Sequence, residues 1–524
     1  MQRNSQKISN SANRRGIAVR RIGNLKILWL YYKLRTAGGV QYSAKINSRG
    51  PESGLAGCGN FMAKSKKILL VNPLENYSPR KYDMYPSGAL VLMGTMAHNK
   101  GHSVKIVHQL TDGVDLTELG NILSVFKPDI VGITMNTFQT FHARKISELV
   151  KKTDKNILVV TGGPHPSALK LKIFEDFPCV DVAVIGEGEA AFMEIVEGGD
   201  LSVIPGICFN NKMNPQRPAA MNLDYIPLPN LNLVNFSRNK FTGAEPVGAY
   251  PTMYIMASRG CPFHCIYCNK SVWGNTVRFR RPELILEEIK WLHEKYGVKE
   301  IFFQDDTFNL NREWAEQVFN LIIANGLNRN IIYKTPFRVN EKLVDKKLLE
   351  LAKKAGFWLI FYGVESGNQE MLDKMKKGIT IREVKRAFEL THSVGLKTIA
   401  SFIVGLPGET KKTIEDTFNL QRELKPYFTG SSPAIPFPDT EFEKIVIEKG
   451  HLLIYNHDEY CLDKFIVRTD DLSKTDLEYY RLDIPGKLRL SYLKWVLADS
   501  FKNPGNIIKR GKKFFNLLVN RPRK

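Results

Sequence analysis

The sequence has no apolar run long enough to cross a membrane, because no stretch reaches the roughly 18 consecutive apolar residues that a transmembrane helix needs. Cysteine is scarce, with 7 residues in 524, which excludes a disulfide-stapled secreted scaffold and indicates a reducing compartment, the cytoplasm. Disorder throughout is also excluded, since 43% of the residues are hydrophobic and 10% are aromatic. The length predicts about three folded units.

Acidic residues are scarce at both ends of the chain. The formal net charge is +22, yet residues 1–61 and residues 485–524 each carry eleven Lys or Arg against one acidic residue. Residues 62–484 are therefore almost neutral, without the interleaved basic and aromatic residues of a base-reading module, so nucleic acid is not expected as a partner. Each tail is interpreted either as a contact for phosphate, acidic lipid or RNA, or as a solvated tail without a partner.

The first folded unit is expected over residues 62–198, after a basic and disordered extension over residues 1–61. Short β-branched runs alternate there with amphipathic stretches, which predicts an α/β fold, a Rossmann-like doubly wound domain. The runs are apolar almost throughout, as in parallel strands covered on both faces. They are 67–71, 104–107, 130–134, 157–161 and 182–185. Residues 199–250, rich in Gly, Asn and Pro, predict a linker.

A second alternation of strands and helices spans residues 251–435. Its strand-like runs are 254–258, 300–305, 331–335, 357–364 and 397–405, with helical patterns such as Pro282–Tyr296 between them. Repeated β/α units without a dinucleotide-binding glycine turn predict a partial or full (β/α) barrel, with its chemistry at the carboxyl ends of the strands. Residues 436–524 predict a small, mostly helical C-terminal region with a basic tail.

Three of the seven cysteines, Cys261, Cys265 and Cys268, lie in the loop after the first predicted barrel strand. Thiolates at spacings of four and three can wrap a compact iron–sulfur cluster, and three ligands leave one iron open for a substrate or cosubstrate. The alternative is a zinc loop with His264 as fourth ligand, although zinc loops usually come as two paired ligand turns. A nucleophilic cysteine is a poorer interpretation, because no single thiol is set apart.

The cysteine loop, with Tyr267 immediately before the third cysteine, resembles the signature of the radical SAM superfamily, and the resemblance extends over residues 251–410. Three further segments are similar to strand-end segments of the cobalamin-associated branch of that superfamily. They are IFFQDDTF (301–308), YGVESGNQEML (362–372) and FIVGLPGET (402–410). The resemblance implies a 4Fe-4S cluster on the three cysteines, S-adenosylmethionine (SAM) on the open iron, and a low-potential electron donor as partner.

The same resemblance implies which residues contact SAM. They are Tyr267, Glu365, Ser366, Gly405, Pro407 and Gly408. Glu365 and Ser366 would bond the ribose hydroxyls or the amino group, the glycine turn would approach the adenine, and Tyr267 would pack against the cofactor. The alternatives are a structural ion pair for Glu365 and an ordinary turn for the glycines. Asp305 and Asp306 either line the substrate cavity or brace the barrel mouth.

The first domain resembles the cobalamin-binding domain that precedes the radical SAM barrel in this branch. The similar segments are 86–102, 129–134, 159–168 and 182–192. The residues implied for cobalamin are Thr134, Gly162, Gly163, His165, Gly186 and Glu187. Ordinary turns and, for His165, a loop cap are the alternatives. The pattern Asp-x-His-x-x-Gly, which supplies a lower axial histidine, is absent, so cobalamin is expected to bind without one.

The resemblance implies a radical SAM enzyme that cleaves SAM reductively and, with cobalamin, methylates an unactivated carbon of a small-molecule or lipid-linked substrate. A second hypothesis keeps this fold but has the radical oxidise, rearrange or cyclise the substrate, as in the anaerobic magnesium-protoporphyrin cyclase that the architecture also resembles. A third is a basic, metal-stapled RNA-binding protein. Residues 485–524 are interpreted either as a peripheral contact with the inner face of a membrane or as an amphipathic helix packed on the barrel.

Overall fold

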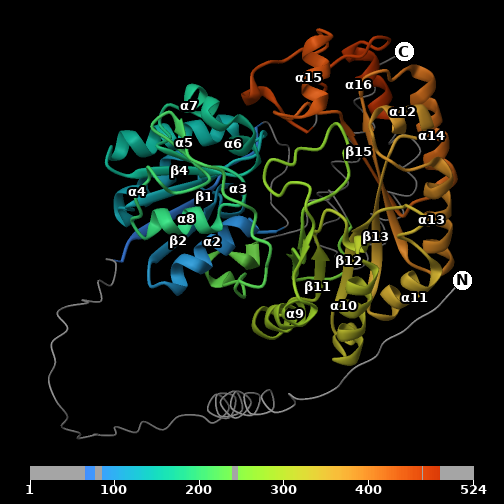
Figure 1. Ribbon diagram of the computed structural model, residues 1–524, viewed down its shortest axis with the longest axis horizontal. Helices are drawn as coiled ribbons and strands as arrows, with labels where there is room; N and C mark the ends of the chain where they lie inside the picture. The colour runs from blue at the N-terminus through green and yellow to red at the C-terminus, as the bar shows by residue number, and fades with distance from the viewer. Residues whose placement is uncertain (1–64, 77–84, 239–245, 463, 484–524) are drawn as a thin grey trace, which may run out of the picture. The chain divides into compact units, whose positions relative to one another are not determined.

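Two mainly parallel sheets organise the computed structural model, which describes residues 65–76, 85–238, 246–462 and 464–483 (Figure 1). The predictions made for residues 1–61 and 485–524 lie outside these described residues. The residues described after Met62 belong to one unit of the fold. None of the helices described combines enough length with enough hydropathy to cross a membrane.

The first sheet has the strand order β2-β1-β3-β4-β5-β6-β7, and β1 to β5 pair in parallel. Its strands are β1 Lys67–Asn72, β2 Ser103–His108, β3 Ile130–Thr134, β4 Leu158–Gly162, β5 Val182–Val184, β6 Ile207–Phe209 and β7 Lys212–Met213. Its helices are α2 Gly88–Asn99, α3 Gln109–Asp112, α4 Leu116–Phe126, α5 Thr140–Thr153, α6 Pro164–Leu169, α7 Ile173–Asp176 and α8 Glu189–Val196. This order confirms the predicted Rossmann-like, doubly wound architecture.

Helices cover both faces of this sheet. Helices α2 and α8 lie on one face, and α4 and α5 lie on the other (Figure 1). Ile68 and Leu70 of β1 pack with α2 and α8, whereas Leu69 and Val71 pack with α4 and α5. Since successive side chains of a strand point to opposite faces, a strand buried on both sides must be apolar throughout. This requirement explains why five apolar runs predicted β1 to β5 so closely.

Residues 199–250 were expected to be a linker, but they supply β6 and β7 to this sheet. β6 pairs antiparallel with β5, and β7 pairs antiparallel with β6. Asn210 and Asn211 form the turn between them, with left-handed φ angles of 48° and 58°, as in a two-residue hairpin loop. The sheet therefore continues past the expected boundary at residue 198. The short hairpin was not predicted, because its Asn-Asn turn lies in a polar stretch of the sequence.

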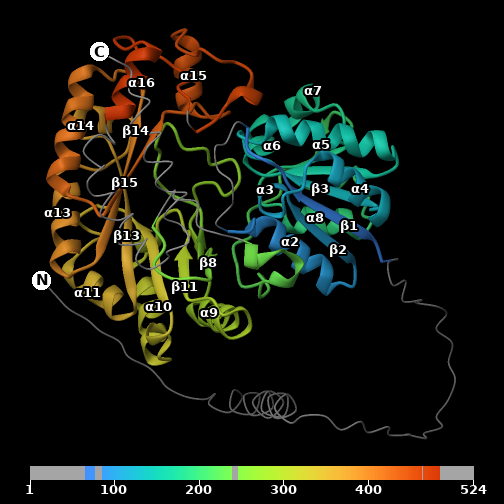
Figure 2. The ribbon, with the colours of Figure 1, turned by 180° about the vertical axis from the view of Figure 1, so that it is seen from behind.

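The second sheet consists of six parallel strands in the order β15-β14-β13-β12-β11-β8. They are β8 Thr252–Ile255, β11 Glu300–Phe303, β12 Ile332–Phe337, β13 Phe357–Glu365, β14 Lys397–Val404 and β15 Phe428–Pro433. Their helices are α9 Pro282–Tyr296, α10 Arg312–Ala324, α11 Lys346–Lys354, α12 Gln369–Lys374, α13 Ile381–Ser393 and α14 Lys411–Leu424. In both views α11, α13 and α14 line one face of a sheet whose two edges do not close, which confirms the partial barrel (Figure 2).

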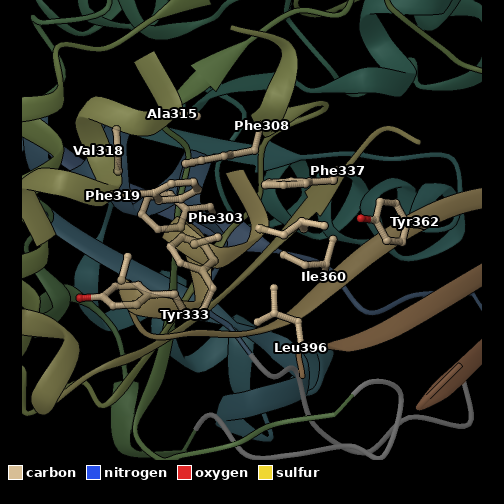
Figure 3. Packing of buried hydrophobic residues seen from close by; sticks show 14 of the residues in the cluster. Phe303, Phe308, Ala315, Val318, Phe319, Tyr333, Phe337, Ile360, Tyr362 and Leu396 are labelled. Atoms are coloured by element: carbon tan, nitrogen blue, oxygen red, sulfur yellow. The ribbon is translucent and has the colours of Figure 1, made fainter. Parts of the chain in front are cut away.

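Aromatic rings fill the space between this sheet and its helices (Figure 3). The ring centroids of Phe303 and Phe357 are 5.7 Å apart, and those of Tyr333 and Phe357 are 5.3 Å apart. Such pairs contribute about 0.5–1.5 kcal/mol beyond their burial. Because side chains alternate along a strand, Glu300 and Phe302 of β11 face the opposite side, the barrel interior.

The described part of the C-terminal region contains α15 Glu441–Glu448 and α16 Lys474–Asp483, but the segment between them is mainly irregular and includes a β-bridge between Leu452 and Val467, so less of it is helical than was expected. Its apolar side chains share a cluster with the cysteine loop, and the amide of Phe442 donates to the carbonyl of Ile266 at 3.0 Å. This region therefore packs directly against the loop that carries the candidate cluster ligands.

Candidate functional site

A short antiparallel ladder closes the loop that carries the three cysteines. β9 Ser258–Arg259, which follows β8, pairs with β10 Arg278–Phe279. Gly260 starts the loop with a φ of +89°, and a Cβ at this position would overlap the carbonyl oxygen of Thr276. The loop thus leaves the carboxyl end of the first barrel strand, as the sequence predicted, and returns beside its own start.

The three thiols lie in a crowded and partly desolvated setting. Cys261 and Cys265 are half-buried, whereas Cys268 is exposed. Desolvation, followed by the nearby Cys265, Asp306 and Cys261, raises the pKa of the Cys268 thiol to about 11. A thiol that is costly to ionise beside two further thiols and a carboxylate suits a group that brings positive charge, as iron in a cluster does.

The zinc alternative is not supported by the described residues. Within them, no three His, Cys, Asp or Glu side chains form a group that could hold a single metal ion; this finding covers Cys261, Cys265 and Cys268 as well as His264. A cation lies against one aromatic ring of this loop, since the guanidinium carbon of Arg338 is 3.4 Å from the centroid of the Phe263 ring.

Lys377 connects the cysteine loop to the end of β13. Its Nζ lies 2.7 Å from Glu365 Oε1 and 3.2 Å from the Tyr267 hydroxyl. Burial, then Glu365 and Cys265, raises the pKa of Tyr267 well above its ordinary value, so the phenol stays protonated. The ion pair considered for Glu365 is therefore present, and it lies beside the cluster loop. Sequence reasoning missed Lys377, because the basic run 374–377 resembles a solvated helix end.

The backbone at Glu365 is strained. Glu365 has a φ of +67°, which costs a side-chain-bearing residue about 1–2 kcal/mol, and the ladder between β13 and β14 shifts its register here. The next residue, Ser366, is fully buried, with its hydroxyl 3.3 Å from Thr417 Oγ1 of α14. The serine hydroxyl thus anchors the turn, while the glutamate carboxylate points to Lys377.

The glycine turn after β14 bends sharply around a buried carboxyl. Gly405 and Gly408, on either side of Pro407, have φ angles of +100° and +81°, which favour residues without a Cβ. The side chain of Glu409 accepts a hydrogen bond from the amide of Gly405, and complete burial raises the pKa of Glu409 to about 7. The Glu409 carboxyl accepts this hydrogen bond whether it is neutral or charged, and so it holds the backbone of the glycine turn in place.

The structure separates the two roles considered for Asp305 and Asp306. Asp305 is buried and accepts hydrogen bonds from both the amide and the hydroxyl of Ser258, the latter at 2.5 Å, so it braces β9 at the barrel mouth. Asp306 is exposed and lies close enough to Cys268 to affect the pKa of that thiol.

The stability of the protein is expected to depend on pH through Asp305. Burial, with a smaller contribution from Asp306, raises the pKa of Asp305 to about 7. The folded state then binds a proton that the unfolded state has lost, so stability falls by roughly 1 kcal/mol for each pH unit between about pH 4 and about pH 7. Asp305→Asn should remove this part of the slope in urea unfolding measured at several pH values. Parallel curves for the two proteins would mean that Asp305 is already ionised in the fold.

On the first sheet, the carboxyl ends of β1, β2 and β3 border a polar cavity of about 170 Å³. Its lining residues are Asn72, Pro73, Glu75, Tyr85, Ser87, His108, Leu110, Asn136 and Gln139. Gln139 Nε2 donates to Asn72 Oδ1 at 3.1 Å, and Asn72 Nδ2 lies 3.2 Å from His108 Nδ1. Ligands of doubly wound folds bind at this edge, where the strand order reverses. Polar residues directly after consecutive strands could have predicted this cavity from the sequence, but this signal was not used.

The residues predicted for cobalamin lie at the carboxyl ends of β3 and β4 and in the loops that follow β4 and β5. Thr134 ends β3, and Gly162 ends β4. Gly163 has a φ of +113°, and a Cβ there would lie 2.8 Å from the carbonyl oxygen of Met135, so a close backbone approach requires this glycine. Gly186, with a φ of +80°, donates its amide to Ser167 Oγ at 3.0 Å.

His165 is buried, and its Nδ1 lies 3.3 Å from Thr137 Oγ1, while its Nε2 has no hydrogen-bond partner among the described residues. Burial, followed by His457 and Arg144, lowers the pKa of His165 to about 3, so the ring is neutral. A neutral imidazole with a free ring nitrogen fits one more hydrogen bond, of the kind that an amide of a corrin side chain offers.

Glu187 does not point to open space. Its carboxylate forms ion pairs with Arg259 and Arg278, the two arginines of β9 and β10. A further contact joins the same two parts of the chain, because Ser271 Oγ donates to the carbonyl oxygen of Pro164 at 3.2 Å. The loop that carries the three cysteines therefore lies beside the loops that follow β4 and β5.

Comparison with known proteins agrees with this arrangement. Residues 255–420 match the model of the radical SAM superfamily, and residues 78–196 match that of the B12 binding domain. The chain is 32% identical to an uncharacterized methyltransferase of Pyrococcus horikoshii, over 85% of this chain and 97% of that protein. It is 26% identical to the anaerobic magnesium-protoporphyrin IX monomethyl ester cyclase of Rubrivivax gelatinosus, over 75% of this chain and 71% of that protein.

A solved structure with a similar fold is the radical SAM methyltransferase TsrM of Kitasatospora setae, described with cobalamin and a [4Fe-4S] cluster bound. The TM-score is 0.61 at 21% identity, over 74% of this chain and 78% of TsrM. The two matched domains carry the cofactors of the family, which are a 4Fe-4S cluster and SAM in one and cobalamin in the other. Together with the cysteine loop, the parallel half-barrel and the 32% identical relative, these findings show that the chain belongs to the radical SAM superfamily, in the branch that joins a B12-binding domain to the radical SAM domain.

Proposed function

We propose that this enzyme transfers a methyl group to an unactivated carbon of a small-molecule substrate. The observation that carries the proposal is the direct contact between the cysteine loop and the loops of the B12-binding domain, through Arg259, Glu187 and Ser271. Radical formation and methyl supply must act on the same substrate carbon, so the two cofactor sites have to be neighbours. The similarity to the Pyrococcus methyltransferase over both domains supports the same function.

The residues have distinct parts in this proposal. Cys261, Cys265 and Cys268 would hold the cluster, while Glu365 and Lys377 would present both signs of charge to the amino-acid end of SAM. When bound, the cofactors supply a radical able to remove hydrogen from an unactivated carbon and a methyl group to replace it. The chain itself positions these groups and excludes water.

Exclusion of water follows from the packing around the cysteine loop. Ile266 is buried among apolar side chains of α12 and the C-terminal region, and its amide donates to the carbonyl of Met375 at 3.1 Å. The ring of Phe263 lies under the Arg338 guanidinium. A dry surrounding protects a reactive radical from quenching and strengthens the electrostatic contacts made inside the site.

A second candidate function keeps the same cofactors but ends without methyl transfer, by oxidation, rearrangement or cyclisation. The similarity to the Rubrivivax cyclase over 75% of the chain favours this alternative. Both functions require a low-potential electron donor and the same machinery for cleaving SAM, so the substrate decides between them.

The proposed function is tested by anaerobic reconstitution with iron, sulfide, cobalamin and a strong reductant. Iron and cobalt counts and the formation of 5′-deoxyadenosine report on the cofactors, and S-adenosylhomocysteine together with a methylated product reports on methyl transfer. We expect all five signals. 5′-Deoxyadenosine with a changed but unmethylated product would support the second candidate, and protein without iron or cobalt would contradict both.

We also propose action in the cytoplasm, with the basic residues 485–524 as a contact to the inner face of an acidic membrane, which would favour a lipid-linked substrate. Co-sedimentation with acidic liposomes at low and high salt tests this contact. The chain without residues 485–524 should lose the salt-sensitive binding, and unchanged binding would refute the contact.

A further inference from the structure

Four buried charges join the cysteine loop to the B12-binding domain. Glu187 and Glu189 follow β5, whereas Arg259 and Arg278 lie on β9 and β10. Arg259 reaches Glu187 at 2.8 Å and Glu189 at 2.7 Å, and Arg278 pairs with the second oxygen of Glu187. The four side chains are between 1% and 10% exposed, and their formal charges cancel.

One carboxylate in this network holds both ends of the cysteine loop. Arg259 and Arg278 face each other in the ladder between β9 and β10, where the loop leaves and returns. Glu187 contacts both arginines, so it crosslinks the base of the loop from the side of the B12-binding domain. The loop touches that domain again farther along, where Ser271 Oγ donates to the carbonyl oxygen of Pro164 at 3.2 Å.

We propose that Glu187 is a positioning residue that fixes the cluster loop against the B12-binding domain, and is not a ligand of cobalamin. The inference rests on the proposed function, because it concerns the separation between the two cofactors that methyl transfer needs. Glu187 Oε2 is hydrogen-bonded to Arg259, Oε1 lies in an ion pair with Arg278 without accepting a hydrogen bond, and the side chain is only 8% exposed, so the carboxylate faces the two arginines rather than an open corrin site. A buried network of this kind specifies geometry more than it adds stability, because desolvation offsets the attraction between its charges.

This role predicts a particular defect. Loss of the Glu187 charge removes the one carboxylate that contacts both strands of the loop base, leaving Arg259 with Glu189 alone and Arg278 without its ion pair, while the cysteines and the barrel residues around them keep their own contacts. SAM cleavage needs the cluster and the barrel only, whereas methyl transfer also needs the B12-binding domain in register. The variant should therefore cleave SAM and fail to methylate, which is the pattern of a misplaced partner rather than of a lost cofactor.

The test compares reconstituted holoenzymes of Glu187→Gln and Glu194→Gln with the unchanged protein. Glu194 is a control on the surface of the B12-binding domain, where its side chain is 42% exposed and holds Arg217 through two contacts of 2.8 Å. In Glu187→Gln we expect iron and cobalt contents to be retained and 5′-deoxyadenosine formation to stay within about threefold, while methylated product per 5′-deoxyadenosine falls at least about tenfold. Glu194→Gln should behave as the unchanged protein does.

A second readout needs no substrate. Electron paramagnetic resonance of the reduced cluster beside cob(II)alamin measures the magnetic coupling between the two centres, which should weaken or spread in Glu187→Gln and stay unchanged in Glu194→Gln. Loss of cobalt with iron retained would make Glu187 a cobalamin ligand and overturn the proposal, as would unchanged coupling in the folded variant. If Glu187→Gln does not fold, Glu187→Asp keeps the charge but is too short to span both arginines, and it is held to the same outcomes.

These readouts distinguish a failure of the proposed function from a failure of the role assigned to Glu187. Absence of methylated product in the unchanged protein would count against the proposed function alone, whereas the cluster–cobalt coupling would still test the role of Glu187.

Discussion

Replacing Cys265 with Ser is expected to abolish cluster assembly, and SAM cleavage with it. Cys265 is the middle ligand of the loop, and two remaining thiolates with a hydroxyl cannot hold a cubane that needs three. Iron and sulfide per chain should fall to background after anaerobic reconstitution, and 5′-deoxyadenosine should become undetectable. Unfolding in urea should change little, since Cys265 is only half-buried in the loop.

Cys179→Ser provides the matched control for this experiment. Cys179 is also half-buried and free, but it lies before β5 in the B12-binding domain. Its replacement should leave iron content and SAM cleavage at the level of the unchanged protein. A Cys265→Ser variant that still bound a full complement of iron would refute the assignment of the loop as the cluster site.

Replacing Lys377 with Met is expected to produce the second large effect, on both stability and SAM binding. The variant leaves the carboxylate of Glu365 buried beside the Tyr267 ring without its cation, and removing one partner of a buried ion pair costs about 3–5 kcal/mol. We expect a loss of about 3 kcal/mol in the free energy of unfolding in urea. The affinity for SAM, measured by calorimetry on the reconstituted protein, should fall by at least about tenfold, or about 1.4 kcal/mol.

The neighbouring Lys376 is a stringent control, because it forms an ion pair with Glu441 in which the two side chains are 54% and 47% exposed. Lys376→Met should cost no more than about 0.5 kcal/mol and leave SAM binding unchanged, because exposed pairs are screened by solvent. Lys377→Arg tests geometry, since a guanidinium keeps the charge but not the compact contact with both Glu365 and Tyr267. Equal effects of Lys376→Met and Lys377→Met would show that the buried pair has no special role.

Local patterns in the sequence were sufficient for most of the secondary structure. The helix predicted over Pro282–Tyr296 is α9 to the residue, because Pro at its first position, Glu283 in its first turn and Gly297 after its end are all local signals. Strand β15, Phe428–Pro433, was not predicted, since its Gly, Ser and Pro residues have little intrinsic strand preference. Pairing with β14 along the sheet edge supplies the hydrogen bonds that make it a strand.

The sequence by itself determined the cysteine spacing, the two α/β units and the family to which they belong, because each is a pattern of residues close together in the chain. Only the tertiary structure decided which partners those residues have. Glu187 and Arg259 are 72 positions apart, and Tyr267 and Lys377 are 110 apart. No local pattern encodes such pairs, because they form only when packing of the sheets and helices brings distant segments together and makes an unpaired buried charge too costly.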